Sequence, residues 1–437
     1  MDLRPGAELE TRPRLARLAL AQPLRIRDFA LLWTGATVSL LGDGIFIVAI
    51  AWQVYELSNV PTALSVVGLA WTAPLAVFLL AGGVVSDRVD RRLVMIAADV
   101  VRALAVATIA ALSLTGHLEL WHLVALAAVY GSGEAFFGPA FSAIVPQIVP
   151  RELLLEANSL DQFIRPFAMR LVGPALGGWL VASFGAGAAF VVDGASFLVS
   201  AVAVGLMAPR PLARAAERAP SVLAELREGL AFVRAHVWLW GTLLAAAFTL
   251  LAYWGPVEVL VPYRIRNDMG GGADDFGYVL ALGGVGSIVA ALVLGQYGLP
   301  RRHVTVMYLT WVAGGFLVAG FGLAATLWQA MAVSFVQGGL FTAGLVIWGT
   351  LMHALVPTEL LGRVTSLDWF VSTSLVPVSF ALTGPLAAGL GAEATLVGGG
   401  VLVGLATLAF LFLPGMRDTE RSDVLAGIRG RPAPTAE

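Results

Sequence analysis

Val149-Pro-Arg-Glu-Leu-Leu154 recurs along this chain as Val356-Pro-Thr-Glu-Leu-Leu361, at a spacing of 207 residues. At the same spacing, the Ser-Leu-Asp of residues 159–161 is repeated at residues 366–368. Chance can produce one Val-Pro pair, but it is a poor explanation for this many matches in the same order. The repeat therefore predicts that the chain is built from two related halves.

The composition is typical of a membrane protein. Of the 437 residues, 58% are of hydrophobic types and only 13% are charged, against about 25% charged residues in soluble domains. The chain has no cysteine, and all 27 of its Lys+Arg residues are arginines. Disulfides, thiolate metal sites and a phosphate-loop ATPase motif, which needs a lysine, are therefore excluded.

Apolar stretches long enough to cross a bilayer recur along the whole chain. A hydrocarbon core about 30 Å thick needs about 20 residues of helix. The sequence predicts twelve spans, at residues 29–57, 61–85, 93–115, 120–148, 152–183, 186–208, 238–262, 275–299, 303–325, 328–355, 359–390 and 393–413. The repeat joins the fourth and fifth spans to the tenth and eleventh, so each half holds six. Since six is even, both halves have the same orientation in the membrane.

The arginines predict how these spans are oriented. Loops after even-numbered spans and the C-terminal tail are rich in arginine, whereas loops after odd-numbered spans are nearly bare, except for Arg264 and Arg266. The positive-inside rule therefore places both termini in the cytoplasm. We expect a multi-pass protein of the bacterial cytoplasmic (inner) membrane.

The predicted organisation has four parts. They are an N-terminal six-helix half with a cytoplasmic N-terminal tail (1–208), a central cytoplasmic loop (209–237), a C-terminal six-helix half (238–414) and a cytoplasmic tail (415–437). In the central loop, Val222, Leu226, Leu230 and Val233 form one apolar stripe, which predicts an amphipathic helix over 221–234. We expect this helix to lie at the membrane surface and to join the halves.

A charged motif, Gly83-Val-Val-Ser-Asp-Arg-Val-Asp-Arg-Arg92, lies between the second and third spans. It resembles the Gly-x-x-x-Asp-Arg-x-Gly-Arg-Arg/Lys loop signature of the major facilitator superfamily, with Asp90 where glycine is usual. The resemblance implies a cytoplasmic latch that holds the two halves together, formed by Gly83, Asp87, Arg88, Arg91 and Arg92. The alternative is that these arginines only set the topology.

The fifth span carries Gly173-Pro174 followed by Gly177-Gly178. This resembles the Gly-Pro-x-x-Gly-Gly motif of facilitator antiporters, and Gly-Pro returns at residues 384–385 in the other half. Proline bends a membrane helix, and small residues let neighbouring helices pack closely. Together with the loop motif, it favours export by antiport over import.

Three further stretches, residues 27–44, 139–160 and 226–233, are similar to one branch of the superfamily, which contains enterobactin exporters and macrolide-efflux drug:proton antiporters. The resemblance covers nearly the whole chain and is specific for fold and branch rather than for substrate. It implies an all-α membrane protein with twelve transmembrane helices in two parallel six-helix halves. The fourth span lacks the arginine that some drug antiporters carry there, and Glu134 is its nearest charge.

Charged residues inside the spans are the candidate site, because a charge at the bilayer centre costs about 2.5–3.5 kcal/mol on insertion scales. Asp43 and Glu134 lie near the middle of spans one and four, and Arg170 lies well inside span five. A carboxylate that faces a low-dielectric cavity can bind and release protons as access alternates. We predict that Asp43 and Glu134 bind protons or a cationic substrate, with Arg170 as a charge partner. The alternative is a permanently buried structural network.

Other intramembrane charges have helical spacing and predict structural ion pairs. Asp99 and Arg102 are three residues apart, Asp161 and Arg165 are four apart, and Asp368 repeats Asp161. Asp193 and Glu258 also lie within spans, and we assign no functional role to them. No carboxylate–histidine array indicates a metal site, and no serine triad or other catalytic site is found.

These features favour a secondary active transporter that exports a small amphipathic compound, such as a drug, a macrolide-like molecule or a siderophore, by alternating access. We expect a proton gradient as the energy source and no cofactor or enzymatic activity. The expected partners are the substrate, protons and the lipid bilayer, without nucleic acid, and the expected state is a monomer. The alternatives are a proton symporter or uniporter that imports a nutrient, and a non-transporting membrane receptor or enzyme, for which no loop is long enough.

Overall fold

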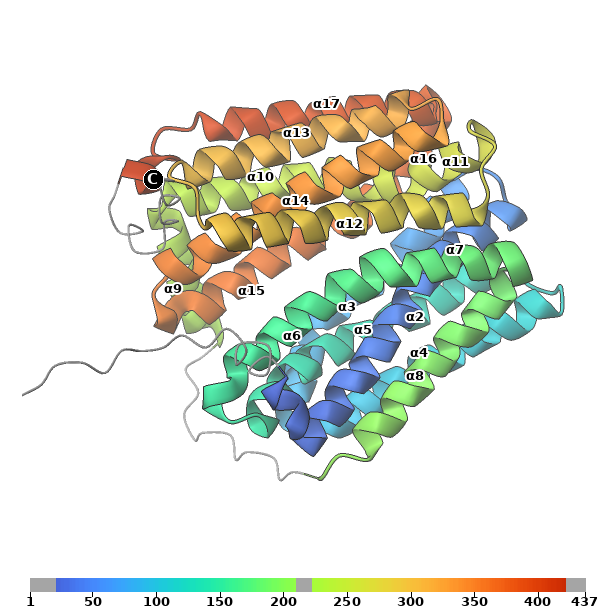
Figure 1. Cartoon of the computed structure of the whole chain (residues 1–437), viewed down its shortest axis with the longest axis horizontal. Coiled ribbons are helices and arrows are strands. Elements are labelled where there is room, and N and C mark those ends of the chain that lie inside the picture. Colours follow the sequence, from blue (N-terminus) through green and yellow to red (C-terminus); the bar gives the residue numbers. More distant parts are fainter. Residues whose placement is uncertain (1–20, 210–221, 422–437) are drawn as a thin grey trace, which may run out of the picture.

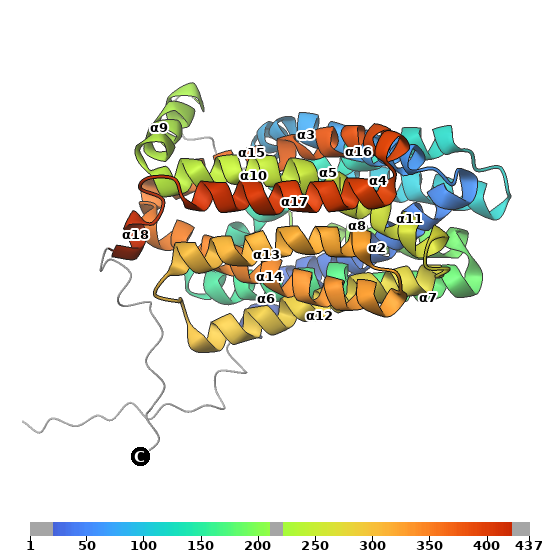
Figure 2. The same cartoon turned by 90° about the horizontal axis from the view of Figure 1, so that it is seen from above.

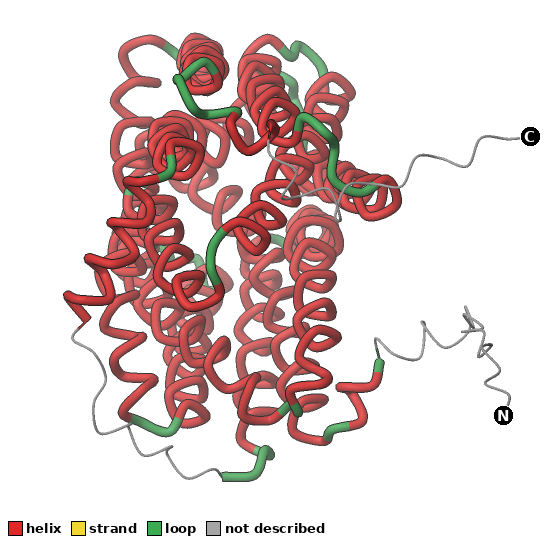
Figure 3. Tube along the Cα trace, turned by 90° about the vertical axis from the view of Figure 1, so that its left-hand side faces the viewer, coloured by secondary structure: helices red, strands yellow, loops and turns green. Residues whose placement is uncertain are grey.

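The computed structural model describes residues 21–209 and 222–421, and the elements in these ranges are helices (Figure 3). The side chains of Leu80, Asp87, Arg151, Thr358 and residues 222–226 are outside the description. Within the described ranges, twelve helices or runs of helices are long and apolar enough to cross a membrane. The predicted twelve transmembrane helices and all-α fold are therefore confirmed.

The N-terminal half begins with the short 3-10 helix η1 and contains six spans. Five of them are single helices, while α6, η3 and α7 together form the fifth span. The elements are η1 Gln22–Arg25, α2 Arg27–Leu57, α3 Pro61–Arg88, α4 Arg91–Leu114, α5 Leu120–Ile148, η2 Arg151–Leu153, α6 Leu154–Pro166, η3 Phe167–Val172, α7 Gly173–Phe184 and α8 Ala186–Gly205.

The C-terminal half follows α9, which covers the stretch for which the amphipathic helix is predicted. Its first span is divided into α10, η4 and α11, and its fifth into α15 and α16. The elements are α9 Val222–Ala235, α10 Val237–Gly255, η4 Pro256–Leu260, α11 Val261–Asn267, α12 Ala273–Tyr297, α13 His303–Leu323, α14 Leu327–Leu355, α15 Thr358–Ser374, α16 Val376–Leu390, α17 Ala392–Leu411 and α18 Asp418–Arg421.

Two spans change their winding at a Gly-Pro pair. The segment η3 is π-helical and ends before Gly173-Pro174, and η4 is a second π-helical segment that begins at Pro256, directly after Gly255. Proline has no N–H group, so an α-helical hydrogen bond is lost there and the winding changes. Such π segments are frequent at functional sites, and these two carry Arg170 and Glu258.

The repeat is visible in a turn that occurs once in each half. Gly185 links α7 to α8 with φ of 80°, and Gly391 links α16 to α17 with φ of 89°. A positive φ is strained for any residue with a Cβ, so glycine permits this single-residue turn between two spans. The fifth and sixth spans of both halves are therefore joined in the same way.

The described chain begins and ends at the same end of the bundle, the terminal end, where η1 enters α2 and α18 follows the last span (Figure 1). There α18 is fastened to the start of α13, because Glu420 Oε1 accepts a hydrogen bond from the Thr305 N–H at 2.6 Å. The helix α9 lies at this end as well (Figure 2) and packs against α10 and α15. On the described part of its predicted apolar stripe, Val233 is buried.

The apolar cores show where the two halves meet. One core at the opposite end contains residues of both halves, including Ile45 on α2 and Phe276 on α12. At the terminal end, one core around Phe29 contains N-terminal residues alone, and another around Tyr308 contains C-terminal residues alone. Among the described residues, the halves therefore share a core only at the opposite end.

The charged motif after the second span differs from the prediction in its secondary structure. Gly83 and Arg88 lie on the last turns of α3, and Arg91 and Arg92 lie on the first turn of α4, so the motif is helical rather than a loop. Asp90 ends the short connection and caps α4, because its Oδ1 accepts the Arg92 N–H at 2.9 Å. A capping carboxylate stabilises the helix start, which accounts for an aspartate at this position.

Candidate functional site

The first part of the candidate site is a group of charged side chains enclosed by the N-terminal half. Asp43 on α2 accepts a hydrogen bond from the Tyr130 hydroxyl of α5 at 2.6 Å. Arg102 on α4 approaches the same Oδ1 atom to 4.0 Å with Nη1. The side chain of Asp43 is 15% exposed, whereas that of Arg102 is 3% exposed. Asp43 is therefore the member of this pair that water can reach.

Arg102 also binds Asp99 on its own helix. Its Nη2 lies 2.5 Å from Asp99 Oδ1, and both residues are buried. The guanidinium stacks over the rings of Phe137 and Phe197, at 4.7 and 4.3 Å from their centroids. The structure thus brings together the residues of the predicted ion pair. It also shows that the pair is joined to Asp43 and is not a separate structural element.

Glu134 lies one helical turn beyond Tyr130 on α5. Its Oε2 accepts a hydrogen bond from the Trp71 indole N–H of α3 at 2.8 Å. Gly133 provides room for the Arg102 side chain, since a Cβ at Gly133 would lie 2.8 Å from Arg102 Cγ. Arg102 interacts electrostatically with Glu134 as well as with Asp43. The two predicted carboxylates therefore surround one guanidinium.

Asp193 on α8 completes this group, although it received no role from the sequence. It is 0% exposed, and its nearest hydrogen-bond partner is the Ser196 hydroxyl, 3.5 Å from Oδ1. Gly42 lets α2 approach α8, because a Cβ at Gly42 would lie 2.5 Å from Asp193 Oδ1. The signal in the sequence was an aspartate inside an apolar span with no arginine three or four residues away.

Arg170 lies elsewhere, which corrects the prediction that it is the charge partner of Asp43 and Glu134. Its side chain is exposed and lies over the Phe341 ring of α14 in the C-terminal half, 5.8 Å from the centroid. It also interacts electrostatically with Glu258 on η4. The π-helical winding of η3 shifts the side-chain direction away from the α-helical expectation. The partner of Asp43 is Arg102 instead.

The C-terminal half presents aromatic and polar groups to Arg170. Tyr253 on α10 stacks on Phe341, with ring planes 3° apart and centroids at 5.9 Å. The Gln337 amide donates a hydrogen bond to the Tyr253 hydroxyl at 2.9 Å. Arg170 also interacts electrostatically with Tyr253. These residues from both halves form the second part of the candidate site, the inter-half group: Arg170, Tyr253, Glu258, Gln337 and Phe341.

The antiporter-like motif is a packing surface at the boundary between helices. A Cβ at Gly173 would lie 2.8 Å from Gly44 Cα, and one at Gly177 would lie 2.9 Å from Ile45 Cα, so both glycines seat α7 against α2. The following Gly178 faces the other half, where its Cβ would lie 2.7 Å from the Ala273 carbonyl oxygen. Pro174 is buried beside them. The motif thus allows backbone contact both within the half and across to α12.

Polar contacts join the halves at the opposite end of the bundle. The Tyr55 hydroxyl donates a hydrogen bond to the Val259 carbonyl oxygen at 2.5 Å. The Asn59 amide donates to Asn267 Oδ1 at 2.5 Å, and Asn267 donates back at 3.1 Å. In addition, a Cβ at Gly384 would lie 2.9 Å from Thr62 Cα. The opposite end is closed by these contacts and by the shared apolar core.

The arginines of the charged motif fasten helices within the N-terminal half. Arg92 Nε donates to the Val204 carbonyl oxygen of α8 at 2.9 Å, and its Nη2 donates to that of Gly205. Arg91 Nη1 donates to the Ala143 carbonyl oxygen of α5 at 3.0 Å. Arg88 is exposed at the end of α3. The side chain of Asp87 lies outside the described residues, and the latch between the halves stays a prediction.

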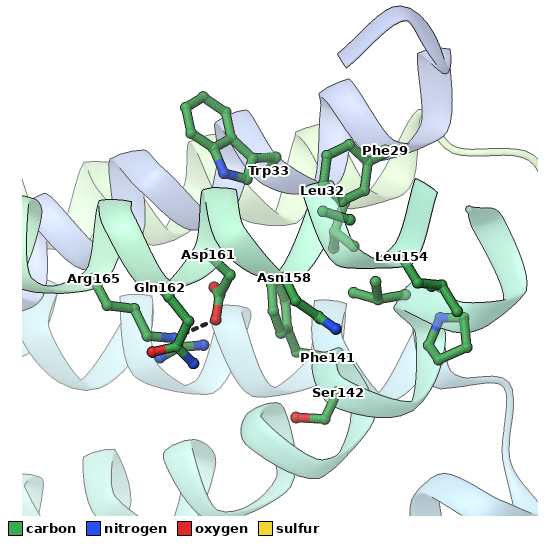
Figure 4. Close-up of a pocket in the computed structure, with 13 residues that line it drawn as sticks. Phe29, Leu32, Trp33, Phe141, Ser142, Leu154, Asn158, Asp161, Gln162 and Arg165 are labelled. Atoms are coloured by element: carbon green, nitrogen blue, oxygen red, sulfur yellow. Dashed lines mark hydrogen bonds and ion pairs between the residues drawn. The ribbon is translucent and has the colours of Figure 1, made fainter. Parts of the chain in front are cut away.

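The predicted pair Asp161–Arg165 lies on the wall of a pocket at the terminal end (Figure 4). Arg165 Nε lies 2.8 Å from Asp161 Oδ2. The pocket has a volume of about 270 Å³ and is bordered by α2, α5 and α6. Its lining residues are Phe29, Leu32, Trp33, Phe141, Ser142, Val145, Pro146, Leu154, Ala157, Asn158, Asp161, Gln162 and Arg165. Aromatic rings and polar groups thus share one wall, as in sites for amphipathic ligands.

The repeat partner of Asp161 has a different environment. Asp368 on α15 accepts a hydrogen bond from the Trp348 indole N–H at 3.2 Å. On the same helix, Arg363 forms an ion pair with Glu228 of α9. Across residues 21–209 and 222–421, no group of three histidine, cysteine or carboxylate residues could hold a metal ion.

Comparisons with known proteins agree with this architecture. The family described as transmembrane secretion effector matches residues 18–434. The multidrug efflux pump Tap of Mycolicibacterium fortuitum is 29% identical over 416 residues, which cover 91% of this chain and 97% of that protein. Macrolide efflux protein A of Streptococcus pyogenes is 26% identical over 280 residues, or 64% of this chain and 69% of that protein. The uncharacterised MFS-type transporter YfiS of Bacillus subtilis is 28% identical over 290 residues, and the match spans 66% of its length.

Solved structures show the same fold at low sequence identity. A bacterial homologue of the human lysosomal transporter Spinster, in an inward-facing and unoccupied conformation, has a TM-score of 0.66 at 15% identity and covers 94% of this chain and 100% of that one. The nucleoside transporter NupG has a TM-score of 0.67 at 10% identity, with 88% of this chain and 98% of that one covered.

Proposed function

The chain belongs to the transmembrane secretion effector family of major facilitator transporters, and we propose that it exports a small amphipathic compound in exchange for protons. A drug, a macrolide-like molecule or a siderophore fits this description. The efflux function of the Streptococcus and Mycolicibacterium relatives supports the direction of transport. The fold and family are those of membrane transporters, and this role needs neither a cofactor nor a catalytic site.

We place both termini in the cytoplasm of a bacterial cell, with the protein in the inner membrane as a monomer. The described arginines at the α3–α4 and α12–α13 connections support this orientation, because these connections lie at the terminal end of the bundle. The opposite end, closed by Tyr55 and by the Asn59–Asn267 pair, then faces outward. In this orientation the end at which the halves have separate cores faces the cytoplasm, where an exporter collects its substrate.

The inter-half group supports an amphipathic substrate. The stacked rings of Tyr253 and Phe341 offer an apolar face, while Arg170, Gln337 and Glu258 offer polar and charged groups around it. Binding sites for organic ligands combine an apolar lining with a few polar groups that set orientation. Because the group draws on both halves, rocking of the halves would assemble and separate the site.

The single observation that carries proton coupling is the environment of Asp43. Its carboxylate is partly exposed, lies 4.0 Å from the buried Arg102, and accepts a hydrogen bond from Tyr130. A group placed between water and a buried cation can gain or lose a proton when the surrounding helices move. Each proton that enters down the membrane potential contributes about 2.3 kcal/mol per 100 mV. Glu134, beside Trp71, is the second acid that we assign to this role.

Vesicle transport tests the proposal. Everted vesicles from a drug-sensitive bacterial host that expresses the full chain should accumulate radiolabelled erythromycin when a proton gradient, acid inside, is imposed. A protonophore should release the drug, and vesicles from the same host with an empty vector should not accumulate it. Gradient-driven uptake into right-side-out vesicles, with none into everted ones, would instead show an importer.

A further inference from the structure

The charges enclosed by the N-terminal half do not balance. Four carboxylates, those of Asp43, Asp99, Glu134 and Asp193, interact electrostatically with Arg102. Arg102 is the one buried cation that the described residues place against them. The more exposed Arg165 of α6 also interacts electrostatically with Asp43 and Glu134, so four carboxylates still face only two cations. An ionised carboxylate without a partner is very costly in a low-dielectric interior, so such groups become neutral instead. The group can therefore exist in this form only if some of its acids hold protons.

The contacts indicate which acid is neutral in this conformation. Asp99 takes the short ion pair with Arg102 at 2.5 Å, Asp43 has the second contact at 4.0 Å, and Glu134 has the Trp71 indole. Asp193 is fully buried, and its Oδ2 atom has no hydrogen-bond partner among the described residues. Its Oδ1 atom has only the Ser196 hydroxyl at 3.5 Å. Asp193 is the acid whose negative charge is compensated least.

The surroundings of Asp193 supply both a route and a counter-charge. Asp43 follows Gly42, whose missing side chain lets α2 lie against Asp193 Oδ1. From α4, Arg102 faces Asp193, and from α5 Tyr130 does so. The other helix that packs against α8, α7, has no charged residue. Asp193 and Asp43 interact electrostatically, and Asp43 is the one of these two acids that is partly exposed, which makes Asp43 the acceptor we assign to a proton that leaves Asp193.

We propose that Asp193 holds the exchanged proton in this conformation and that Asp43 transfers it to and from water. In the step, the O–H bond of Asp193 breaks and an O–H bond forms on the Asp43 carboxylate. Asp193 is then the anion, and the Arg102 guanidinium compensates it in place of Asp43. The proton leaves Asp43 for water when that residue is exposed. The inference rests on proton-coupled transport and names the residue that stores the proton.

The test uses the full chain reconstituted in liposomes with radiolabelled erythromycin. Asp193→Asn replaces the acid by a neutral amide of the same shape, so the fold is kept but no proton can be released. We expect proton-gradient-driven accumulation to fall by about tenfold or more, since the proton-transferring group is gone. Counterflow, which exchanges drug for drug without net proton movement, should stay at the wild-type level. The control Glu393→Gln changes an exposed carboxylate on α17. It should alter neither the gradient-driven accumulation nor the counterflow.

Gradient-driven accumulation by Asp193→Asn at the wild-type rate would overturn the inference. If the variant loses counterflow as well, proton release per bound erythromycin is measured in detergent with a pH-sensitive dye. Less release than from the wild type at equal drug binding supports the role of Asp193, and equal release refutes it. A wild-type protein that binds erythromycin but shows no gradient-driven transport of it would instead refute the proposed function, so the two failures are distinguishable.

Discussion

Arg102 joins an ion pair on its own helix to a carboxylate of a neighbouring helix, because it contacts both Asp99 and Asp43. The i, i+3 spacing on α4 is enough to form the 2.5 Å contact between Arg102 and Asp99. The third residue arrives from α2, and Gly133 on α5 leaves the space that the arginine side chain occupies. A guanidinium held between two carboxylates can change its preferred partner as the helices shift. The charge compensation of Asp43 therefore depends on the conformation of the helix bundle.

Replacement of Asp43 by asparagine should separate coupling from binding. In Asp43→Asn the carboxylate that exchanges protons with water is gone, while the Tyr130 hydroxyl still has an oxygen to which it can donate. We expect gradient-driven efflux to fall by about tenfold or more and to lose its dependence on pH, with erythromycin binding retained. Transport rates across a pH series in everted vesicles check this. Unchanged gradient-driven transport would remove Asp43 from the mechanism.

At the level of elements, α7 is one of the N-terminal helices that also contact the C-terminal half. Its glycines lie at backbone contact with α2 on one side and with α12 on the other. The preceding π-helical segment and Pro174 make this span the least regular one of its half. Such a helix can transmit a shift of α12 to α2 and so to Asp43.

The contact of Gly178 with α12 predicts a change in conformational preference. In Gly178→Ala the new Cβ would lie 2.7 Å from the Ala273 carbonyl oxygen, and overpacking of this kind costs about 1–3 kcal/mol. The closed opposite end becomes less stable, so the conformation open at the terminal end is less populated. Maleimide labelling of Asn158→Cys, an exposed residue of the pocket, should then be slower.

The matched control for this experiment is Gly138→Ala. This glycine also lies within a helix, but a Cβ there would meet no atom within 4 Å. Because the chain has no native cysteine, the labelled position is the same single thiol in both variants. Equal labelling rates in Gly178→Ala and Gly138→Ala would contradict the role given to the α7–α12 contact.

At the level of the whole molecule, the two halves are held together at one end and have separate cores at the other. The shared core, the Tyr55–Val259 hydrogen bond and the asparagine pair all lie at the closed end. Each half is thus able to move as a unit, because its own core is complete at the terminal end. Rocking about the central helices would close that end and open the other.

A cross-link between the halves should stop this motion. The side chains of Asn59 and Asn267 are hydrogen-bonded at 2.5 Å, so a short bis-methanethiosulfonate reagent should cross-link the double variant Asn59→Cys, Asn267→Cys. We expect transport to be lost after treatment with the cross-linker and restored by dithiothreitol, while the single-cysteine variants are unaffected. Full transport by a protein shown to be cross-linked would mean that the opposite end does not open.

Local patterns determined the broad features of this protein. The number of spans and their limits follow from hydropathy, because a helix in a bilayer satisfies its backbone hydrogen bonds within the span itself. The parallel repeat follows from short matching segments such as 149–154 and 356–361. The pairing of Asp99 with Arg102 follows from helical spacing for the same reason. The family resemblance rests on motifs that are short and local as well.

The partners of charged groups on different spans were decided only by the tertiary structure. Asp43 lies on α2 and its partner Arg102 on α4. Gly42 of α2 likewise contacts Asp193 of α8. Both contacts depend on the rotation of each helix about its own axis. That rotation results from side-chain packing between helices and, for Arg170, from the π-helical turn that directs it to the other half. Sequence alone identified most of the charges that matter, but packing decided which of them share a counter-charge.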